Sequence, residues 1–358
     1  MTIHTVWQLN RRVAVPPAVA AGTHGGLEIK LGKIQRAGLL LSLFAAVTGF
    51  SLQPVAATAQ PFPSRPVRMI VPNLAGSATD VVARMVAQRF TEMWGQQVVV
   101  DNRAGASGVI GTELTAYAPA DGYTILMGTS AALVIVPLIS KVPYETLRDL
   151  TPVSLVVVSP QMLVSHPSVA AKNVKELVAL ARANPGKMNC GSPGTGTSNH
   201  LGCELLKVMT KTDILHVPYR GASAAITDLV GGQLHFLFNS MPAVWPLAKA
   251  GKLVALAYGG TKRSSAAPEV PTVAESIPGF QCTTWYALIA PGNMPKPILA
   301  KLNGDMVRML NEPAFSKRIV DQGQEPKSTT SAELGAFMRE ESTRWAGVIK
   351  AAGLTTAK

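Results

Sequence analysis

The chain has 358 residues, of which 47% are hydrophobic and 15% are charged. This composition excludes a disordered or polyionic protein, and the length is sufficient for two domains with buried cores. The formal net charge is +12, but the basic residues are spread along the chain and do not alternate with aromatic residues, which argues against nucleic-acid binding.

The N-terminal segment has the order of features found in secretory signal peptides. Three basic residues precede an apolar run over 37–52, and small residues follow it: Lys30, Lys33 and Arg36, then Ala57-Thr58-Ala59. We therefore predict a signal peptide over about residues 30–59, cleavage after Ala59 and a periplasmic protein. A retained membrane anchor is the alternative, although the run is short for a membrane span.

The first strand and helix of the mature chain are joined by a polar turn. Residues 68–72 form a short apolar run, and apolar residues recur at helical spacing from Val82 to Met93. Between them, Ser77 and Asp80 stand three residues apart, as in a helix-capping box. This spacing favours a structural role for Asp80 over direct ligand contact.

Two more strands and polar turns follow the same plan. Residues 98–100 predict a buried strand, and a glycine-rich turn over 101–111 leads into a helix. This turn lacks the GxGxxG spacing of dinucleotide sites. Residues 123–127 predict a third strand that ends at Thr129 and Ser130. The repeated order of strand, turn and helix predicts a doubly wound α/β sheet.

The second half of the chain repeats the pattern after a crossing. Apolar runs over 155–158 and 163–164 flank Ser159-Pro160, and we interpret them as the first crossing between two lobes. The following elements are a helix, three strands, a return crossing and a helical C-terminal part; their predicted ranges are 175–183, then 214–219, 235–238 and 253–257, then 285–290.

The most distinctive segment is the turn over 189–200, which combines three glycines with four hydroxyl side chains before a helix. Glycines allow the backbone to approach a ligand closely, and the helix presents unpaired N–H groups and the positive end of its dipole. The segment therefore predicts an anion site, most simply for a carboxylate or phosphate. An ordinary strand-to-helix turn is the alternative.

The cysteines and histidines show no metal-binding pattern. Cys190, Cys203 and Cys282 have no metal-ligand spacing, and either one disulfide or three free thiols is compatible with the sequence. His200 and His216 are expected to be hydrogen-bonded structural residues, because no third ligand stands at a suitable spacing.

Several motifs occur in a fixed order along residues 62–354: Val71-Pro72…Gly76…Asp80, Asn102-Arg103-x-Gly105-Ala106-x-Gly108…Gly111, His216-Val217-Pro218-Tyr219-Arg220-Gly221, Asp228-Leu229-x-Gly231-Gly232-Gln233, Ala250-Gly251-Lys252-Leu253, and Val270-Pro271-Thr272-Val273-x-Glu275. Together they resemble the substrate-binding proteins of tripartite tricarboxylate transporters, the Bug family. The resemblance implies a type-2 periplasmic-binding-protein fold, with a ligand cleft between two lobes that carry doubly wound sheets. We assign residues 60–158 and 285–358 to lobe 1 and residues 159–284 to lobe 2.

The resemblance also implies a function and a site. Such proteins bind a small carboxylate by lobe closure and deliver it to a membrane permease, holding the ligand mainly with backbone amides and small hydroxyls. By position, the expected ligand-binding residues are Ala75, Gly76, Ser77, Thr129, Ser130, Ser192, Gly194, Thr195, Gly196, Thr197 and Asn239. We expect a monomer with no cofactor, metal or catalytic residue.

Some positions depart from the family pattern or leave alternatives open. Asn73 replaces a usual Phe, Ser77 a frequent Gly, and Val136-Pro137 a common Asn-Pro. His235 stands where Asp is usual. Arg220 is added to the expected site because its planar guanidinium could grip a carboxylate; pairing with a neighbouring acid is the alternative.

Two other function classes, a hydrolase and a sensor partner, make different demands on the sequence. A hydrolase would need a nucleophile elbow with a histidine and an acid, and the serines lack both the G-x-S-x-G spacing and an evident base. A ligand-loaded sensor partner of a membrane receptor would use the same cleft as a transport protein, so the sequence does not separate these two.

Overall fold

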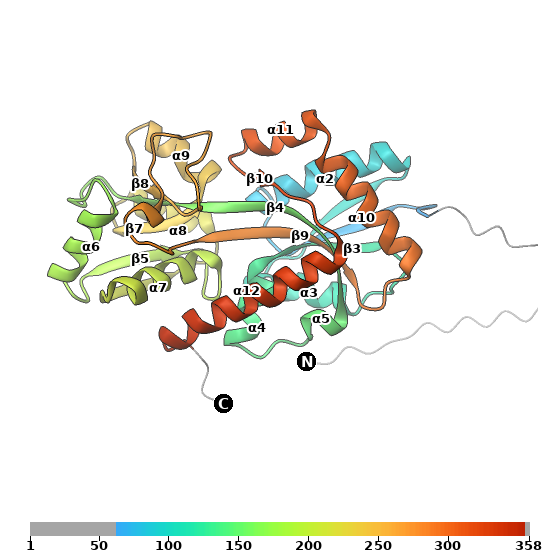
Figure 1. Ribbon diagram of the computed structural model, residues 1–358, viewed down its shortest axis with the longest axis horizontal. Coiled ribbons are helices and arrows are strands. Elements are labelled where there is room, and N and C mark those ends of the chain that lie inside the picture. The colour runs from blue at the N-terminus through green and yellow to red at the C-terminus, as the bar shows by residue number, and fades with distance from the viewer. Residues whose placement is uncertain (1–61, 355–358) are drawn as a thin grey trace, which may run out of the picture. The chain divides into compact units, whose positions relative to one another are not determined.

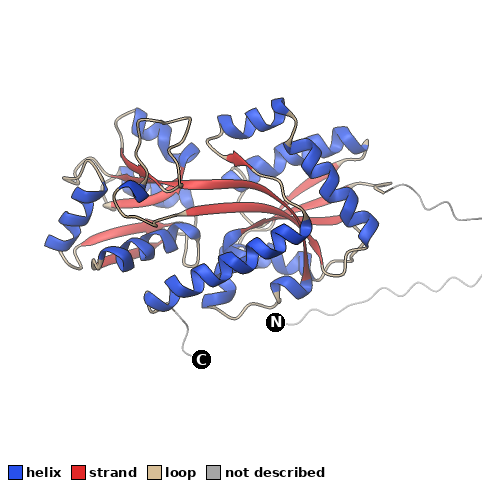
Figure 2. Cartoon of the chain, viewed as in Figure 1, coloured by secondary structure: helices blue, strands red, loops and turns tan. Residues whose placement is uncertain are grey.

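The computed structural model describes residues 62–354, which form helices packed around a mixed sheet (Figures 1 and 2). The predicted signal peptide lies outside the described residues. The strands are β1 Val67–Val71, β2 Val98–Asn102, β3 Thr124–Thr129, β4 Leu150–Ser165, β5 Met188–Ser192, β6 Ile214–Pro218, β7 Phe236–Ser240, β8 Val254–Tyr258, β9 Thr283–Pro291 and β10 Glu325–Pro326.

The helices and helical turns follow the strands in alternation over most of the chain. They are α2 Ala78–Trp94, η1 Ala106–Gly108, α3 Val109–Ala116, η2 Ala131–Ile135, α4 Val136–Ile139, α5 Thr146–Asp149, α6 Val174–Ala183, α7 Ser198–Thr210, α8 Ala222–Val230, α9 Met241–Lys249, η3 Val273–Glu275, α10 Lys296–Leu310, α11 Pro313–Asp321 and α12 Ser331–Ala351. The strands and the helix for which residue ranges are predicted are all present, with small shifts at their ends. The C-terminal part is mainly helical, as predicted.

The sheet consists of two parallel groups joined by two long antiparallel strands. Its order is β2-β1-β3-β9-β4-β7-β5-β6, and β8 and β10 also pair with β4. β1 is parallel to β2 and β3, and β5 is parallel to β6 and β7. In Figure 1, β4 and β9 run side by side through the centre between these groups. Parallel strands need crossover helices, which explains why α2, α3, α7 and α8 lie between them in sequence.

β4 belongs to both groups. Residues 150–160 of this strand pair with β9, and residues 161–165 pair with β7 and β8. The two apolar runs that flank Ser159-Pro160 thus join into one strand of 16 residues. The predicted lobe boundaries fall inside β4 and β9; they remain a prediction.

Each parallel group has its own apolar core. On the β1 side, Met69 of β1 packs in one cluster with Phe90 of α2 and Met306 of α10. On the β5 side, Leu206 of α7 packs with Phe236 and other side chains of β7. Burying one such side chain stabilises a fold by about 1.5–3 kcal/mol. Two further clusters complete the packing, and one of them joins Ile70 of β1 to Leu201 of α7.

The last helix, α12, is hydrogen-bonded to the crossing strand β9. Glu341 Oε2 accepts hydrogen bonds from the indole N–H groups of Trp285 on β9 and of Trp345, at 3.1 and 3.2 Å. Arg344 Nε donates to Glu341 Oε1 at 2.8 Å, and Arg344 Nη1 reaches the Gln281 carbonyl at 3.3 Å. Both tryptophans are fully buried, so Trp285 has a packing role.

Candidate functional site

The turn between β1 and α2 contains the first three predicted site residues. Ser77 caps α2, because its side chain accepts a hydrogen bond from the Asp80 N–H at 3.3 Å. Asp80 in return accepts from the Gly76 N–H at 2.9 Å, one residue further back than in a regular capping box. Ala75 and Gly76 are exposed and Ser77 is partly exposed. The turn is therefore fixed from inside while its outer surface faces solvent.

Asp80 anchors this turn and is almost completely buried. Its carboxylate accepts from Arg84 Nε and from Asn102 Nδ2, both at 2.9 Å. Burial alone would raise the pKa of Asp80, but the hydrogen bonds from Arg84, the Gly76 amide and Asn102 outweigh it and hold this pKa below its usual value. Asp80 stays ionised in the structural role that its sequence position favoured.

A row of polar side chains starts where β3 ends. Thr129 and Ser130 are buried, and Ser130 Oγ lies 3.0 Å from Thr284 Oγ1 on β9. Thr284 stands opposite Ser159 of β4 in the sheet register, so the two side chains share one face. The Ser159 hydroxyl is buried without a hydrogen-bond partner.

The row continues into the β5 side. Gln161 Oε1 accepts from Asn199 Nδ2 at 2.8 Å, and the same amide donates to the Phe238 carbonyl. Next in sequence, Asn239 Oδ1 accepts from the Ser240 N–H at 2.8 Å, which fixes the orientation of that amide. Asn239 is 3% exposed, and its Nδ2 is buried without an acceptor among the described residues. An unpaired buried donor destabilises a protein, so this position would gain from an added acceptor.

The loop between β5 and α7 carries five predicted site residues. Thr197 caps α7 by accepting from the His200 N–H at 3.3 Å, and its own hydroxyl donates to the Gly194 carbonyl at 2.8 Å. The Gly194 amide donates to Ser192 Oγ at 3.2 Å. Gly196 has a φ of 80°, which glycine adopts without strain. These bonds turn the loop so that it meets α7 at the positive end of the helix dipole.

Thr195, at the tip of this loop, is exposed. No acceptor for its amide is found within residues 62–354, whereas its carbonyl accepts from Ser107 Oγ at 2.8 Å. Ser107 lies in the glycine-rich turn after β2 and has a φ of 54°, in the left-handed region. The turn is predicted from its glycines, but Ser107 is not among the predicted site residues. The unusual backbone of Ser107 was not visible from the sequence.

Two stacked histidines support the β5–α7 loop from beneath. Their ring centroids are 3.9 Å apart; His200 Nδ1 accepts from the Gly196 N–H at 3.2 Å, and His216 Nε2 lies 2.6 Å from Ser192 Oγ. Burial lowers the pKa of His200 to about 3, helped by the charges of His216 and Lys207. Burial and Lys207 lower the pKa of His216 to about 4. Both rings are therefore neutral at pH 7 and act as structural residues, as expected.

The Ser192–His216 contact corrects one point of the sequence analysis. Ser192 does have a histidine within hydrogen-bonding distance, because β5 and β6 are parallel neighbours and bring the two residues together. No carboxylate hydrogen-bonds to His216 in the described part of the chain, and the Ser192 hydroxyl is already engaged with Gly194. The pair thus lacks the acid of a catalytic triad.

The two sides of the molecule touch through these loops. One contact between them is the Ser107–Thr195 hydrogen bond. Another lies at Gly196, where an added Cβ would be 2.8 Å from Ile139 Cδ1 and 3.0 Å from Val136 Cγ2. Val136 is one of the departures from the family pattern. The short distances and the φ of 80° at Gly196 favour glycine here, and they show that the two sides approach each other closely along this edge.

Arg220 is exposed and has no ion pair or hydrogen bond within residues 62–354. The alternative that it pairs with a neighbouring acid therefore finds no support there. The preceding Tyr219 donates from its hydroxyl to Asp228 Oδ2 at 2.7 Å. Burial, this hydrogen bond and the charge of Asp228 raise the pKa of Tyr219 to about 12. Tyr219 thus hydrogen-bonds to α8, whereas the guanidinium of Arg220 has no partner among the described residues.

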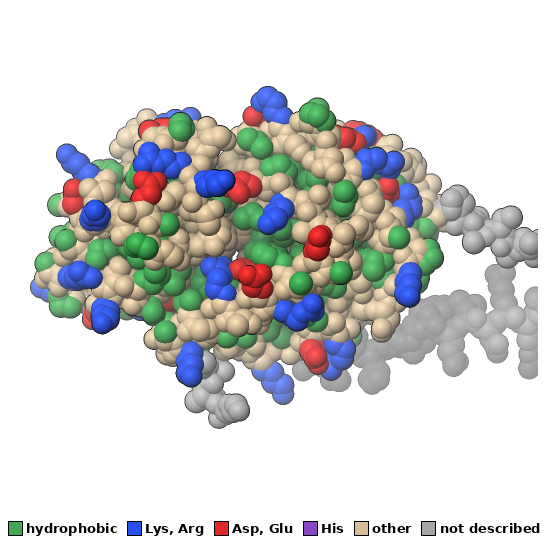
Figure 3. Space-filling view, in the orientation of Figure 1, with side chains coloured by type: hydrophobic (Ala, Val, Ile, Leu, Met, Phe, Trp, Pro, Cys, Tyr) green, Lys and Arg blue, Asp and Glu red, His purple; other side chains and the backbone are tan. Residues whose placement is uncertain are grey.

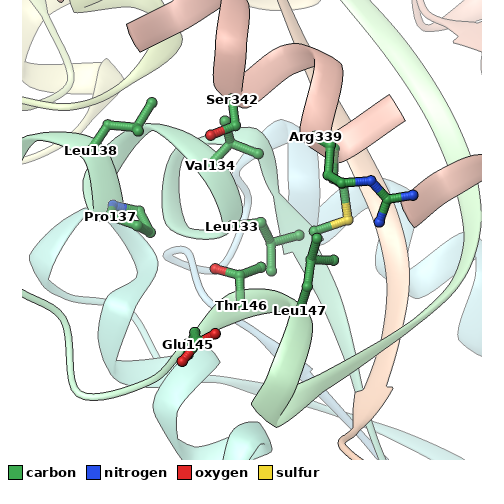
Figure 4. Close-up of a pocket in the computed structure, with 10 residues that line it drawn as sticks. Leu133, Val134, Pro137, Leu138, Glu145, Thr146, Leu147, Arg339 and Ser342 are labelled. Atoms are coloured by element: carbon green, nitrogen blue, oxygen red, sulfur yellow. The ribbon is translucent and has the colours of Figure 1, made fainter. Parts of the chain in front are cut away.

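Two cavities are found away from these loops, and neither is lined by a predicted site residue. One, of about 260 Å³, lies between η2, α4, the α5 turn and α12; its lining includes Leu133, Val134, Pro137, Leu138, Glu145, Thr146, Leu147, Arg339 and Ser342 (Figure 4). The other, of about 310 Å³, lies between residues 258–265 and 320–326.

Three further features of the described residues concern charge, metal ligands and membrane spans. On the face shown in Figure 3, Lys and Arg side chains lie scattered among Asp and Glu. The described residues contain no group of three or more His, Cys, Asp or Glu side chains placed to hold a metal ion. Among the same residues, no helix is long and apolar enough to cross a membrane.

Residues 82–354 match the model of the family described as tripartite tricarboxylate transporter family receptor. The chain belongs to this family. It is 39% identical to the protein BugT of Bordetella pertussis over 321 residues, which cover 88% of this chain and 96% of BugT. It is 36% identical to a UPF0065 protein of Pseudomonas sp. strain P51, over 89% of this chain and 95% of that protein.

Solved structures of similar proteins have the same two-lobe fold. Rpa4515 of Rhodopseudomonas palustris, solved with adipate, is 33% identical with a TM-score of 0.78, over 82% of this chain and 98% of that one. MatC from the same organism, solved with malate, is 30% identical with a TM-score of 0.74, over 80% of this chain and all of that one. The periplasmic binding protein BugD is 32% identical with a TM-score of 0.76, over 83% of this chain and all of that one.

These comparisons confirm the predicted family and the type-2 periplasmic-binding-protein fold. The family and its solved members are solute-binding proteins and not enzymes, which settles the hydrolase alternative that the Ser192–His216 contact had reopened.

Proposed function

We propose that this protein captures a small organic acid between its two lobes and delivers it to the membrane permease of a tripartite transporter. The observation that carries the proposal is Asn239. Its Nδ2 is a buried donor with no acceptor among the described residues, and its orientation is fixed by the Ser240 N–H. A carboxylate oxygen is a strong acceptor for such a donor.

Other polar groups on the β5 side suit a carboxylate. Because β5 and β7 are parallel, the β5–α7 loop starts at the same edge of the sheet as the end of β7 that carries Asn239. Thr195 offers a free amide at the tip of the β5–α7 loop, close to the N-terminal end of the 13-residue helix α7. Ser159 of β4 is a second buried polar group without a partner among the described residues, on the sheet face that it shares with Thr284 of β9. Solved relatives hold adipate and malate, which supports the same ligand class here. The predicted residues Ala75, Gly76, Ser77, Thr129 and Ser130 would complete the site from lobe 1.

Lobe closure is the proposed mechanism of capture. The contact between Ser107 and Thr195 joins the turn after β2 to the β5–α7 loop. A ligand that touches both loops stabilises the arrangement in which they meet, because it gains contacts there that an open form lacks. We infer a periplasmic monomer, exported by the signal peptide predicted over about residues 30–59, with permease subunits as its partners.

A thermal-shift screen of the mature protein against small carboxylates, amides and amines tests the ligand class. A carboxylate at about 100 times its Kd is expected to raise the Tm by roughly 5 °C. Stabilisation by amines or neutral compounds alone would contradict the carboxylate assignment. Delivery is tested separately by comparing uptake of the labelled hit in cells with and without this protein; equal uptake would contradict a transport role.

A further inference from the structure

The only disulfide in the described part of the chain closes around the proposed ligand loop. It joins Cys190 of β5 to Cys203 of α7, thirteen residues apart, with a Cα–Cα distance of 6.3 Å. Both cysteines are buried. The segment that they enclose, 191–202, contains five of the predicted ligand-binding residues.

The other ties of the enclosed loop are hydrogen bonds: the Thr197 and Ser192 hydroxyls donate to the Gly194 carbonyl, and the Gly221 N–H donates to the Pro193 carbonyl at 3.1 Å. Gly194 and Gly196 have φ values of 150° and 80°, and glycine loses more conformational freedom on ordering than any other residue. Their amides are held by single hydrogen bonds to Ser192 Oγ and His200 Nδ1. The exposed Thr195 between them is tied by its carbonyl to Ser107 of the other lobe. An open molecule would lose that last contact.

We propose that the Cys190–Cys203 disulfide holds this loop in its ligand-receiving conformation when the lobes are apart, so that both cysteines are positioning residues for carboxylate capture. The proposal rests on the proposed function for its ligand. A loop that is already ordered loses less conformational entropy when the ligand binds, so the affinity is higher. The disulfide fixes both ends of the segment, while the histidines hold its middle.

Other contacts already dock α7 onto the sheet. Leu206 and Leu205 of α7 pack in the same cluster as Phe236 and Phe238, and Asn199 is bonded to Gln161 and Phe238. The helix therefore has apolar and polar anchors that remain when the disulfide is removed. The segment that depends most on the covalent link is the glycine-containing stretch before α7.

The third cysteine provides a matched control. Cys282 is a fully buried free thiol whose Sγ lies 3.5 Å from the Ser198 carbonyl. Burial raises the pKa of Cys282 to about 12, so at neutral pH it stays protonated and does not attack the neighbouring disulfide. Removing this thiol changes the same apolar cluster without opening the loop.

The first test is hydrogen–deuterium exchange on the ligand-free protein, comparing the double variant Cys190→Ala/Cys203→Ala with Cys282→Ala. We expect the amides of Gly194 and Gly196 to exchange at least tenfold faster in the double variant, with the strands unaffected. Unchanged loop exchange would overturn the proposal. So would a uniform rise across the protein, which indicates a disulfide that acts on global stability alone.

A second form of the test does not depend on folding of the variant. Dithiothreitol converts the disulfide of the unmutated protein to two thiols, taking up two electrons and two protons from the reductant. The same local rise in exchange is expected, and its absence after complete reduction would overturn the proposal.

Calorimetric titration with adipate and malate at 25 °C supplies the functional readout. Whichever acid binds, we expect the double variant to bind it about tenfold more weakly, and Cys282→Ala to bind it normally. Equal affinity in a folded double variant would overturn the positioning role. If the unmutated protein binds no carboxylate in the wider screen, the proposed function fails, whereas the exchange experiment still decides whether the disulfide orders the loop.

Discussion

The β1–α2 turn and the β5–α7 loop are equivalent places in the two lobes, but they are held in different ways. The first is anchored by an ionised group, Asp80, which is bonded to Arg84 and Asn102. The second is anchored by two neutral histidines and a disulfide. The same backbone task, fixing a polar turn at the start of a helix, is thus performed by charge in one lobe and by neutral and covalent contacts in the other.

This difference predicts different responses to acid. A carboxyl group whose pKa is lowered in the folded state, such as Asp80, stabilises the fold at pH values above its unfolded-state pKa of about 3.9. This contribution is lost as the pH falls through the lower pKa of the folded state. The histidines of the unfolded chain take up protons once the pH falls below about 6.5, whereas the same histidines with lowered pKa values in the folded protein do not. Below that pH they therefore destabilise the fold. The β5–α7 loop should therefore weaken first on acidification, from about pH 6.5 down to the folded pKa values of about 4 for His216 and about 3 for His200, and the β1–α2 turn only below about pH 4.

The largest effect is expected from Asn239→Asp, on the β5 side of the site. This change keeps the oxygen that accepts from Ser240 and replaces the unpaired donor with an acceptor. We expect carboxylate affinity to fall about 100-fold, from the lost charge-assisted hydrogen bond and added repulsion. Gln324→Glu is the control, since Gln324 is another buried amide with an unpaired oxygen, away from the loops. Unchanged affinity in Asn239→Asp would mean that the ligand does not use this amide.

Asp80→Asn tests the charged anchor of the β1–α2 turn. We expect the free energy of unfolding at pH 7 to fall by about 2 kcal/mol. Between pH 4 and pH 3, the variant should lose less of its free energy of unfolding than the native protein does. Urea unfolding at several pH values measures both. Asp121→Asn is the control, because its ion pair with Arg65 is exposed and such pairs contribute little. Equal effects of the two changes would contradict the anchoring role of Asp80.

Thr195→Asp places a negative charge at the tip of the β5–α7 loop. We expect about tenfold weaker carboxylate binding by like-charge repulsion, with folding largely intact. Thr227→Asp, on the exposed side of α8, adds the same charge outside the loop. Calorimetric titration should show the loss in the first variant only; an equal loss in both would indicate a general charge effect.

His216→Gln should give the smallest change. Glutamine can still hydrogen-bond to Ser192 but does not titrate, so the stability lost between pH 7 and pH 5 should shrink by about 1 kcal/mol. His166→Gln serves as the control, since the His166 ring hydrogen-bonds only to Ser168 among the described residues, directly after the end of β4. If His216→Gln leaves the pH dependence of urea unfolding unaltered, the neutral histidine is not what makes the loop acid-sensitive.

Much of the fold could be predicted from the sequence, because the apolar runs and glycine-rich turns alternate regularly. The cap of α2 at Ser77 follows from local spacing, whereas Thr197, predicted as a ligand-binding residue, is found to cap α7. The joining of two apolar runs into β4 did not follow, since Ser159-Pro160 interrupts them in sequence while pairing with β9 continues through both residues.

The site was harder to predict, because its parts come together only in the folded sheet. The row formed by Ser159, Gln161, Thr284 and Asn199 depends on strand register, and the single signal was the presence of polar residues inside apolar runs. The pairing of Cys190 with Cys203, left open by the sequence, is decided by the turn that brings α7 back against β5. The placement of the predicted ligand residues around a carboxylate remains a prediction.

The central claim is that the unpaired amide of Asn239 receives a carboxylate. Its most direct test is an NMR titration of the ¹⁵N-labelled protein with the carboxylate that gives the largest thermal shift, following the side-chain amide protons of Asn239. We predict a downfield shift of one of these protons that saturates with the binding curve. Full saturation by the ligand with the Asn239 amide resonances unmoved would contradict the claim.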